Sequence, residues 1–189
     1  MDKIAGLPAH PLLVHIPVVL VPLAAIGALV MAFWPWLRAR IGWIVAGLAV
    51  LGGLGAILAA SAGESLQEGK PESSAIRHHA ELGEGARNFS ILFAILVVLF
   101  VAGEWWLKRR AAHTSQSNDT ADAAQKPAVW MKWVLPAAAV LTVASGAWAT
   151  YSVIDAGHTG AKATWQNEGR GGPAADGDIA PPYQDHDDD

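Results

Sequence analysis

The sequence has no cysteine and only three methionines. Without cysteine the chain can form no disulfide, no thiolate metal site and no Cys-x-x-Cys-His haem attachment. The scarcity of methionine disfavours a soft Cu(I) site. Histidine is therefore the side chain to consider for haem iron, zinc or another divalent metal.

Charge is also scarce, since Lys, Arg, Asp and Glu make up 16% of the residues and the net charge is −4. A negative chain gives no electrostatic support for a nucleic-acid partner. The sequence also has no phosphate-binding loop, no Gly-x-Ser-x-Gly and no His-Glu-x-x-His. No sequence motif therefore supports a hydrolase function, and whether the chain is an enzyme stays open.

What the sequence has in abundance is apolar residues, which make up 52% of the chain. They form four long runs, at residues 12–36, 41–62, 89–107 and 130–154. Each run has about the 20 residues that a helix needs to cross a hydrocarbon core. Uninterrupted runs of this length predict helices, since only helices and closed barrels satisfy their backbone in lipid. We expect an all-α integral membrane protein, an antiparallel four-transmembrane-helix bundle over residues 1–165 with a disordered acidic tail at 166–189.

Tryptophan and basic residues mark the ends of the runs. Trp residues border the first and third connections, and these connections also carry basic residues, namely Arg38, Arg40, Lys108, Arg109 and Arg110. The positive-inside rule places both connections in the cytoplasm. The N-terminus, the connection 63–88 and the C-terminus are then expected outside a membrane that we take to be the bacterial cytoplasmic membrane. Residues 111–127 have the composition of a flexible linker.

The second apolar run is rich in small residues at a spacing of four. Gly52, Ala56 and Ala60 form one such series, and Gly55, Ala59 and Gly63 another. This pattern lets helices approach closely in lipid, where packing replaces the hydrophobic effect. Close packing is the favoured interpretation, and room for a flat cofactor is the alternative.

Five histidines lie near the expected outer ends of the helices: His10, His15, His78, His79 and His158. An imidazole in or near lipid is costly, so such a cluster predicts a functional site. His15 and His79 are the leading ligands, because His15 is inside the first apolar run and His79 enters the third helix across the bundle. The sequence does not decide between His78 and His79. The other histidines are reserved for a second centre or for outer-shell hydrogen bonds.

Carboxylates accompany these histidines. Tyr151, Asp155 and His158 are spaced i, i+4 and i+7, which places them on one helical face. A carboxylate one turn before a histidine can accept its ring N–H and fix the tautomer of a ligating imidazole. We expect Asp155 to orient His158, and Glu64, at the end of the second run, to serve similarly.

Two classes of function follow from this cluster. Two histidines that face each other across a bundle would hold a b-type haem, which suits a membrane electron-transfer protein with a redox partner on the outer face. Histidine and carboxylate together could instead hold Zn or another divalent metal. The alternative is therefore a non-redox accessory or metal-binding membrane subunit, and either protein could be an oligomer in the lipid bilayer.

Four short motifs resemble those of the bacterial membrane family called domain of unknown function 2231. They are the octapeptide from His10 to Pro17, Ser61-Ala62-Gly63-Glu64, His78-His79-Ala80, and Gly157-His158-Thr159-Gly160-Ala161. The resemblance covers residues 8–165. The last motif departs from the family pattern, because Ala161 replaces a second glycine and Ala163-Thr164-Trp165 replaces an aliphatic-aromatic ending. The similarity of this family to di-haem membrane cytochromes implies haem binding.

Overall fold

Four long helices dominate the computed structural model, which describes residues 3–4, 7–67, 74–116 and 131–168. The helices are α1 (Ala9–Phe33), α2 (Pro35–Gln67), α3 (Ser74–Gln116) and α4 (Met131–Glu168). Before α1, the two-residue strands β1 (Lys3–Ile4) and β2 (Leu7–Pro8) pair antiparallel, with Ile4 opposite Leu7. All four helices are long and apolar enough to cross a membrane. The predicted all-α bundle of four membrane spans is confirmed.

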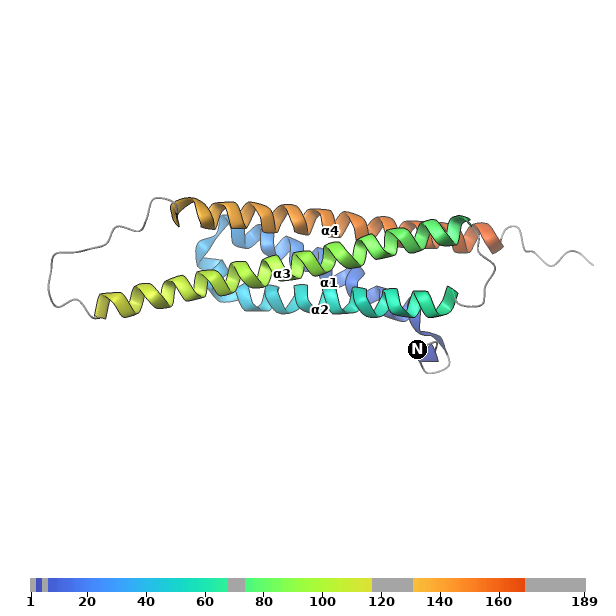
Figure 1. Ribbon diagram of the computed structural model, residues 1–189, viewed down its shortest axis with the longest axis horizontal. Coiled ribbons are helices and arrows are strands. Elements are labelled where there is room, and N and C mark those ends of the chain that lie inside the picture. Colours follow the sequence, from blue (N-terminus) through green and yellow to red (C-terminus); the bar gives the residue numbers. More distant parts are fainter. Residues whose placement is uncertain (1–2, 5–6, 68–73, 117–130, 169–189) are drawn as a thin grey trace, which may run out of the picture.

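The helices run up, down, up and down along one long axis (Figure 1). Each of α1 and α3 packs along both α2 and α4, while α1 and α3 touch only slightly across the diagonal of the bundle. One end holds the start of α1 and of α3, and we call it the histidine end. The opposite end holds Trp34, Trp36, Trp105, Trp106 and Trp133, and we call it the tryptophan end.

The helices extend well beyond the apolar runs. With 43 residues, α3 is about 64 Å long, against a hydrocarbon core of about 30 Å. Much of the segment expected to connect the second and third runs is therefore helical. Residues 111–116 of the predicted linker belong to α3, and residues 166–168 of the predicted tail belong to α4. The remainder of both segments lies outside the described residues.

The first connection is shorter than predicted. Arg38 and Arg40 were expected in it, but both lie in the first turns of α2, because α2 begins at Pro35 directly after Trp34. Proline suits the first position of a helix, where no N–H partner is needed. The Trp34 N–H donates to the Val30 carbonyl at 3.0 Å, and the Trp34 carbonyl accepts the Arg38 N–H at 3.0 Å. The backbone of Trp34 is therefore hydrogen-bonded both to the last turn of α1 and to the first turn of α2.

Small side chains and a repeat of seven residues define the bundle core. Every seventh residue is buried along the inner face of each helix: Pro17, Ala24 and Met31 on α1, Gly42, Ala49 and Ala56 on α2, Ala86, Phe93 and Phe100 on α3, and Ala139, Gly146 and Val153 on α4. A seven-residue repeat keeps one stripe of a helix facing its neighbours and produces the shallow crossings of four-helix bundles. Large exposed side chains such as Ile26, Leu99 and Val140 lie outside these stripes, and they face the lipid.

The close packing predicted for the second run is found between α1 and α2. A Cβ atom added at Gly52 would lie 2.9 Å from Val21 Cγ2. One added at Gly55 would lie 2.8 Å from Ile16 Cβ and 3.2 Å from Pro17 Cδ. Such distances are too short for real side chains, so α1 approaches α2 as closely as it does only because these positions have no side chain.

Replacing Gly55 by leucine should destabilise the protein, because the new side chain would collide with Ile16 and Pro17. Overpacking of this kind typically costs about 1–3 kcal/mol. Gly47→Leu is a matched control on the same helix, since nothing lies within 4 Å of a Cβ atom at Gly47. Thermal unfolding in detergent measures both variants. Equal melting temperatures for the two would contradict the packing described here.

Candidate histidine site

Two of the five histidines meet at the histidine end of the bundle. The ring centroids of His10 on α1 and His79 on α3 are 6.2 Å apart, and the ring planes are nearly perpendicular, at 83°. Both side chains are half-buried. Because α1 and α3 are diagonal neighbours, the two imidazoles meet across the centre of the bundle rather than along one of its sides.

The seven-residue repeat explains why these two histidines face inward. His10 stands seven residues before Pro17, and His79 stands seven residues before Ala86, so both continue the buried stripe of their helix. The same step takes the α2 stripe from Ala56 to Gly63 and the α4 stripe from Val153 to Gly160. The last layer of the bundle therefore consists of two histidines and two glycines, with the histidines on opposite helices.

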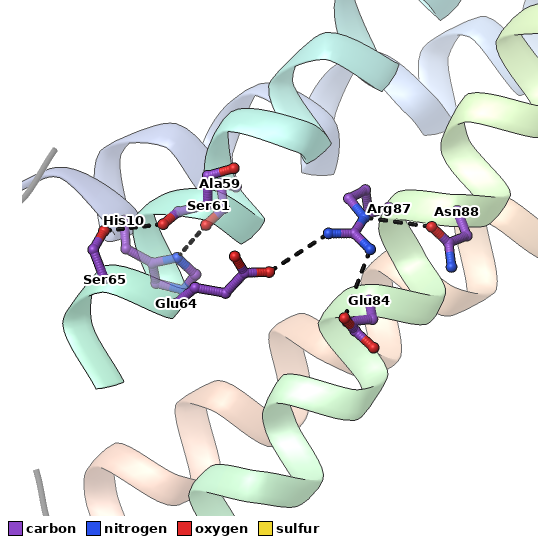
Figure 2. A network of polar contacts seen from close by, with 8 residues as sticks. All are labelled: His10, Ala59, Ser61, Glu64, Ser65, Glu84, Arg87 and Asn88. Carbon is purple, nitrogen blue, oxygen red and sulfur yellow. Dashed lines mark hydrogen bonds and ion pairs between the residues drawn. The ribbon is translucent and has the colours of Figure 1, made fainter. Parts of the chain in front are cut away.

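His10 is held by the backbone of α2. Its Nδ1–H donates to the Ala59 carbonyl oxygen at 2.8 Å (Figure 2). A carbonyl oxygen has two lone pairs, so it can accept this bond in addition to its helical one. A Cβ atom at Gly63 would lie only 3.1 Å from His10 Nδ1. The missing side chain at Gly63 is therefore what lets the imidazole reach the α2 backbone.

His79 is held in the corresponding way by α4. Its Nδ1 lies 3.4 Å from Thr159 Oγ1, and the ring also has a hydrogen bond to the backbone of Ala156. The Thr159 hydroxyl itself donates to the backbone of the preceding turn, with the Ala156 and Asp155 carbonyl oxygens at 3.0 and 3.1 Å. With the ring proton of His79 on Nδ1, Thr159 Oγ1 is its acceptor. A Cβ atom at Gly160 would lie 2.8 Å from His79 Cε1, so this glycine also makes room for a ring.

These hydrogen bonds set the chemistry of the pair. A neutral imidazole whose Nδ1 carries the proton keeps the lone pair on Nε2, and that lone pair is what binds a metal. Metal-binding histidines usually donate the other ring N–H to a carbonyl, carboxylate or hydroxyl, which fixes their tautomer and orientation. Both His10 and His79 have such a partner. The arrangement therefore provides two oriented nitrogen donors.

The other three predicted histidines are exposed. The Nδ1–H of His15 donates to the carbonyl oxygen of Pro11 on its own helix at 2.7 Å. His78 and His158 are out of phase with the buried stripes of α3 and α4. The sequence favoured His15 and His79, whereas the structure brings together His10 and His79.

The residues predicted to support the histidines lie elsewhere or act differently. Asp155 contributes its backbone carbonyl, which accepts the Thr159 hydroxyl bond at 3.1 Å. Tyr151 is exposed, and its ring lies 5.8 Å from that of Trp148. Glu64 is adjacent to Gly63, but its carboxylate reaches toward Arg87 on α3 at 3.6 Å (Figure 2).

Arg87 links α2 to α3 beside the histidine pair. It lies 3.7 Å from Glu84 on its own helix, and its Nε donates to Asn88 Oδ1 at 3.4 Å. The Glu64 side chain is 61% exposed and that of Arg87 27%, so water screens this network and it adds little stability. Figure 2 draws this network together with His10.

Four residues of this site were not predicted as part of it: Ala59, Gly63, Thr159 and Gly160. Ala59 and Gly63 were expected only to pack helices, and Gly63, Thr159 and Gly160 were named only within the motifs that resemble the family. Ala59 acts through its backbone, and the two glycines act by lacking a side chain, so none of the three has a chemical signature of its own. The repeat of seven is the signal that could have found the glycines, because it places each of them opposite a histidine.

The fold and the site define a class of protein, a four-span membrane bundle with a histidine pair seated on glycines at one end. The chain belongs to the family described as Predicted membrane protein (DUF2231), whose model matches residues 6–169 and thus all four helices. The family membership predicted from the sequence motifs is confirmed. No curated protein and no solved structure matches the chain.

Gly160→Ala should displace the His79 ring, because the new methyl group would lie 2.8 Å from Cε1. Gly157→Ala is the control one turn earlier on α4, where nothing lies within 4 Å of an added Cβ atom. Imidazole resonances of His79 in nitrogen-labelled protein report the ring environment. We expect them to shift in the first variant and to stay unchanged in the second, and the reverse pattern would refute the seating described here.

Proposed function

We propose that this membrane protein binds a b-type haem at the histidine end, where His10 and His79 would hold the iron, and that it transfers electrons. The meeting of His10 and His79 across the bundle is the observation that carries this proposal. A bound haem would supply a one-electron iron couple. The residues of the chain would hold the iron, fix the two imidazole orientations and restrict the access of water.

The described residues fit two imidazoles that would hold one iron from opposite helices. His10 Nδ1–H donates to the Ala59 carbonyl, which leaves Nε2 as the donor nitrogen of that ring. With Nδ1 protonated and bonded to Thr159, His79 would present Nε2 in the same way. Each ring also rests where a glycine leaves space, at Gly63 or Gly160. A Cβ atom at Gly160 would lie 2.8 Å from His79 Cε1, and one at Gly63 would lie 3.1 Å from His10 Nδ1, so a side chain at either position would require the ring to shift. Helices α2 and α4, which carry no proposed ligand, therefore leave space for the histidines of α1 and α3.

The number of ligands favours haem over zinc. A zinc site in a protein usually has three or four protein ligands, whereas haem iron needs at most two. Within the part of the chain that the structure describes, no group of three or more His, Asp or Glu side chains is placed to hold a metal ion. A pair of imidazoles without a third ligand is suited to haem.

The position along the helices suits electron exchange at a membrane surface. Counting about 20 residues from Trp105 across a hydrocarbon core ends near residue 85 of α3. His79 is six residues further, about 9 Å at the rise of an α-helix. The proposed ligands thus lie at the level of the lipid headgroups, within reach of a redox partner protein on that side. At this depth the two histidines are partly buried, and a redox partner can still approach them from outside the membrane.

Protein purified in mild detergent and supplied with haem should show the visible spectrum of a six-coordinate b-type haem that changes on reduction with dithionite. His10→Ala and His79→Ala should each abolish the spectrum. Thr159→Val keeps the shape of the side chain but removes the acceptor of the His79 bond, and loss of such a partner typically weakens metal affinity about 10–100-fold. A haem titration followed by absorbance measures all three variants.

His15→Ala and His158→Ala are the controls, because both histidines are exposed, and each should retain the parent spectrum. Added imidazole should restore the spectrum of a His79→Gly variant, which separates a lost ligand from a lost fold. A parent protein that takes up no haem would refute the proposal. Equal loss in His15→Ala and His10→Ala would refute the choice of ligands.

We also propose that the histidine end and both termini face the outside of a bacterial cytoplasmic membrane. The support is the charge at the tryptophan end, where Arg38, Arg40 and the run from Lys108 to Arg110 lie. Basic residues beside membrane spans favour the cytoplasmic side. On this orientation the proposed haem faces the exterior.

Single cysteines test the orientation, since the chain has none of its own. Ala112 and Lys162 are exposed and lie near opposite ends of the bundle. In intact cells a membrane-impermeant maleimide should label Lys162→Cys but reach Ala112→Cys only after the membrane is permeabilised. The opposite pattern would reverse the proposed orientation, and equal labelling of both in intact cells would contradict the topology.

A further inference from the structure

An apolar groove lies between α2 and α3 on the outer surface of the bundle. It has a volume of about 280 Å³, and every residue that lines it is apolar or glycine. The buried residues Gly53 of α2 and Ala94 of α3 form its floor, and exposed side chains such as Leu54 and Ile95 form its walls. Ile95 is ten residues from Trp105, about halfway along the roughly 20 residues that cross a hydrocarbon core. The groove therefore lies near the middle of the bilayer.

Gly53 is not required for the packing of α2 against α3. A Cβ atom there would lie 3.5 Å from the Ser90 carbonyl oxygen and 3.6 Å from Ala94 Cβ, which are ordinary contacts. At Gly52 and Gly55 the added atom would instead collide with α1. Glycine in the middle of a helix is destabilising relative to alanine. The packing of the bundle therefore gives no reason for glycine at position 53, whereas an object seated in the groove would.

A rigid partner explains a fixed groove better than a lipid chain does. An acyl chain is flexible and fills surfaces of any shape, whereas two helices approach closely in lipid only where small residues leave room for side chains. The partner must also be apolar and have no unsatisfied backbone, because the middle of the bilayer holds no water. A second transmembrane helix meets these requirements.

The groove is bordered by a ridge of side chains that would fill the same groove in another copy of the chain. Leu54, Ile95 and Leu99 of this ridge are 51%, 50% and 62% exposed. Copies in one membrane have the same orientation, so the two-fold axis of a dimer runs along the membrane normal and each residue meets the partner at its own depth. A ridge beside a groove satisfies this condition, because the ridge of each copy enters the groove of the other.

We propose that the protein forms a two-fold symmetric dimer through this groove, in which α2 and α3 of one copy pack against α2 and α3 of the other. The surface lies midway between the histidine end and the tryptophan end, and the inference does not depend on haem binding. Rotation about the membrane normal places the histidine ends of both copies on the same side of the membrane.

Self-association in vesicles of phosphatidylethanolamine and phosphatidylglycerol tests the dimer. Single-molecule counting of the fluorescently labelled full chain, over a range of protein-to-lipid ratios, should show dimers of the parent. The variant Leu54→Ala/Ile95→Ala/Leu99→Ala removes the ridge and should weaken self-association about tenfold or more, since packing is lost at three positions. A parent that stays monomeric at every ratio, or a ridge variant that associates as well as the parent, would overturn the proposal.

The matched control removes side chains from the opposite surface of the bundle. Ile26 of α1 and Val140 and Leu141 of α4 are 60%, 68% and 59% exposed, so Ile26→Ala/Val140→Ala/Leu141→Ala truncates a comparable apolar surface away from the groove. This variant should associate as the parent does. A loss equal to that of the ridge variant would show that the groove is not the interface.

Gly53→Ala separates the interface from the fold. The added methyl group makes only ordinary contacts within the chain, so the melting temperature of the monomer, measured in dilute detergent, should not fall. The narrower floor should nevertheless weaken self-association in vesicles severalfold, and an undiminished association would count against the groove. If the parent is monomeric and native mass spectrometry finds a phospholipid that only Gly53→Ala loses, a lipid chain occupies the groove and the dimer is refuted.

Discussion

The close approach of α1 to α2 is the contact on which the histidine site depends. It runs along one line of glycines on α2, where Gly52 faces Val21, Gly55 faces Ile16 and Gly63 faces His10. In lipid no hydrophobic effect drives helices together, so the close packing that glycine positions allow has to supply much of the attraction. The same line that packs the two helices brings the His10 ring within hydrogen-bond distance of the α2 backbone.

The two ends of the inner face of α3 differ in chemistry. At the tryptophan end, Glu104 follows the buried Val97 by seven residues, and its carboxylate pairs with Arg38 of α2. At the histidine end, His79 precedes the buried Ala86 by seven residues and contacts Thr159 of α4. A charged group needs a charged partner when it leaves water, whereas a neutral imidazole needs only a polar one. The ion pair of Glu104 can therefore be buried at the tryptophan end, while a neutral imidazole at the histidine end keeps one ring nitrogen whose lone pair is free to bind a ligand.

Run length predicted the four spans, and small-residue spacing predicted close packing of the second span, which the structure places against α1. The choice among the histidines rested on depth in the apolar run and took no account of the helical face. His15 was favoured over His10 because it lies deeper in the apolar run, yet depth says nothing about which face of a helix a side chain occupies. Counting in sevens from Pro17 or Ala86 selects His10 and His79. The hydrogen bonds to Ala59 and Thr159 could not be predicted, since they depend on the relative heights of the four helices.

Packing also bears on why a pair of histidines would stand on diagonal helices. Adjacent helices meet along their sides, where glycine and alanine already fill the contact, so two rings there would force the helices apart. Across the diagonal α1 and α3 hardly touch, and side chains of ring size can meet in the centre without disturbing any close contact. The glycines on α2 and α4 then widen that central space for the rings. A site that needs two opposed donors therefore fits the end of such a bundle without loss of the packing that holds it together.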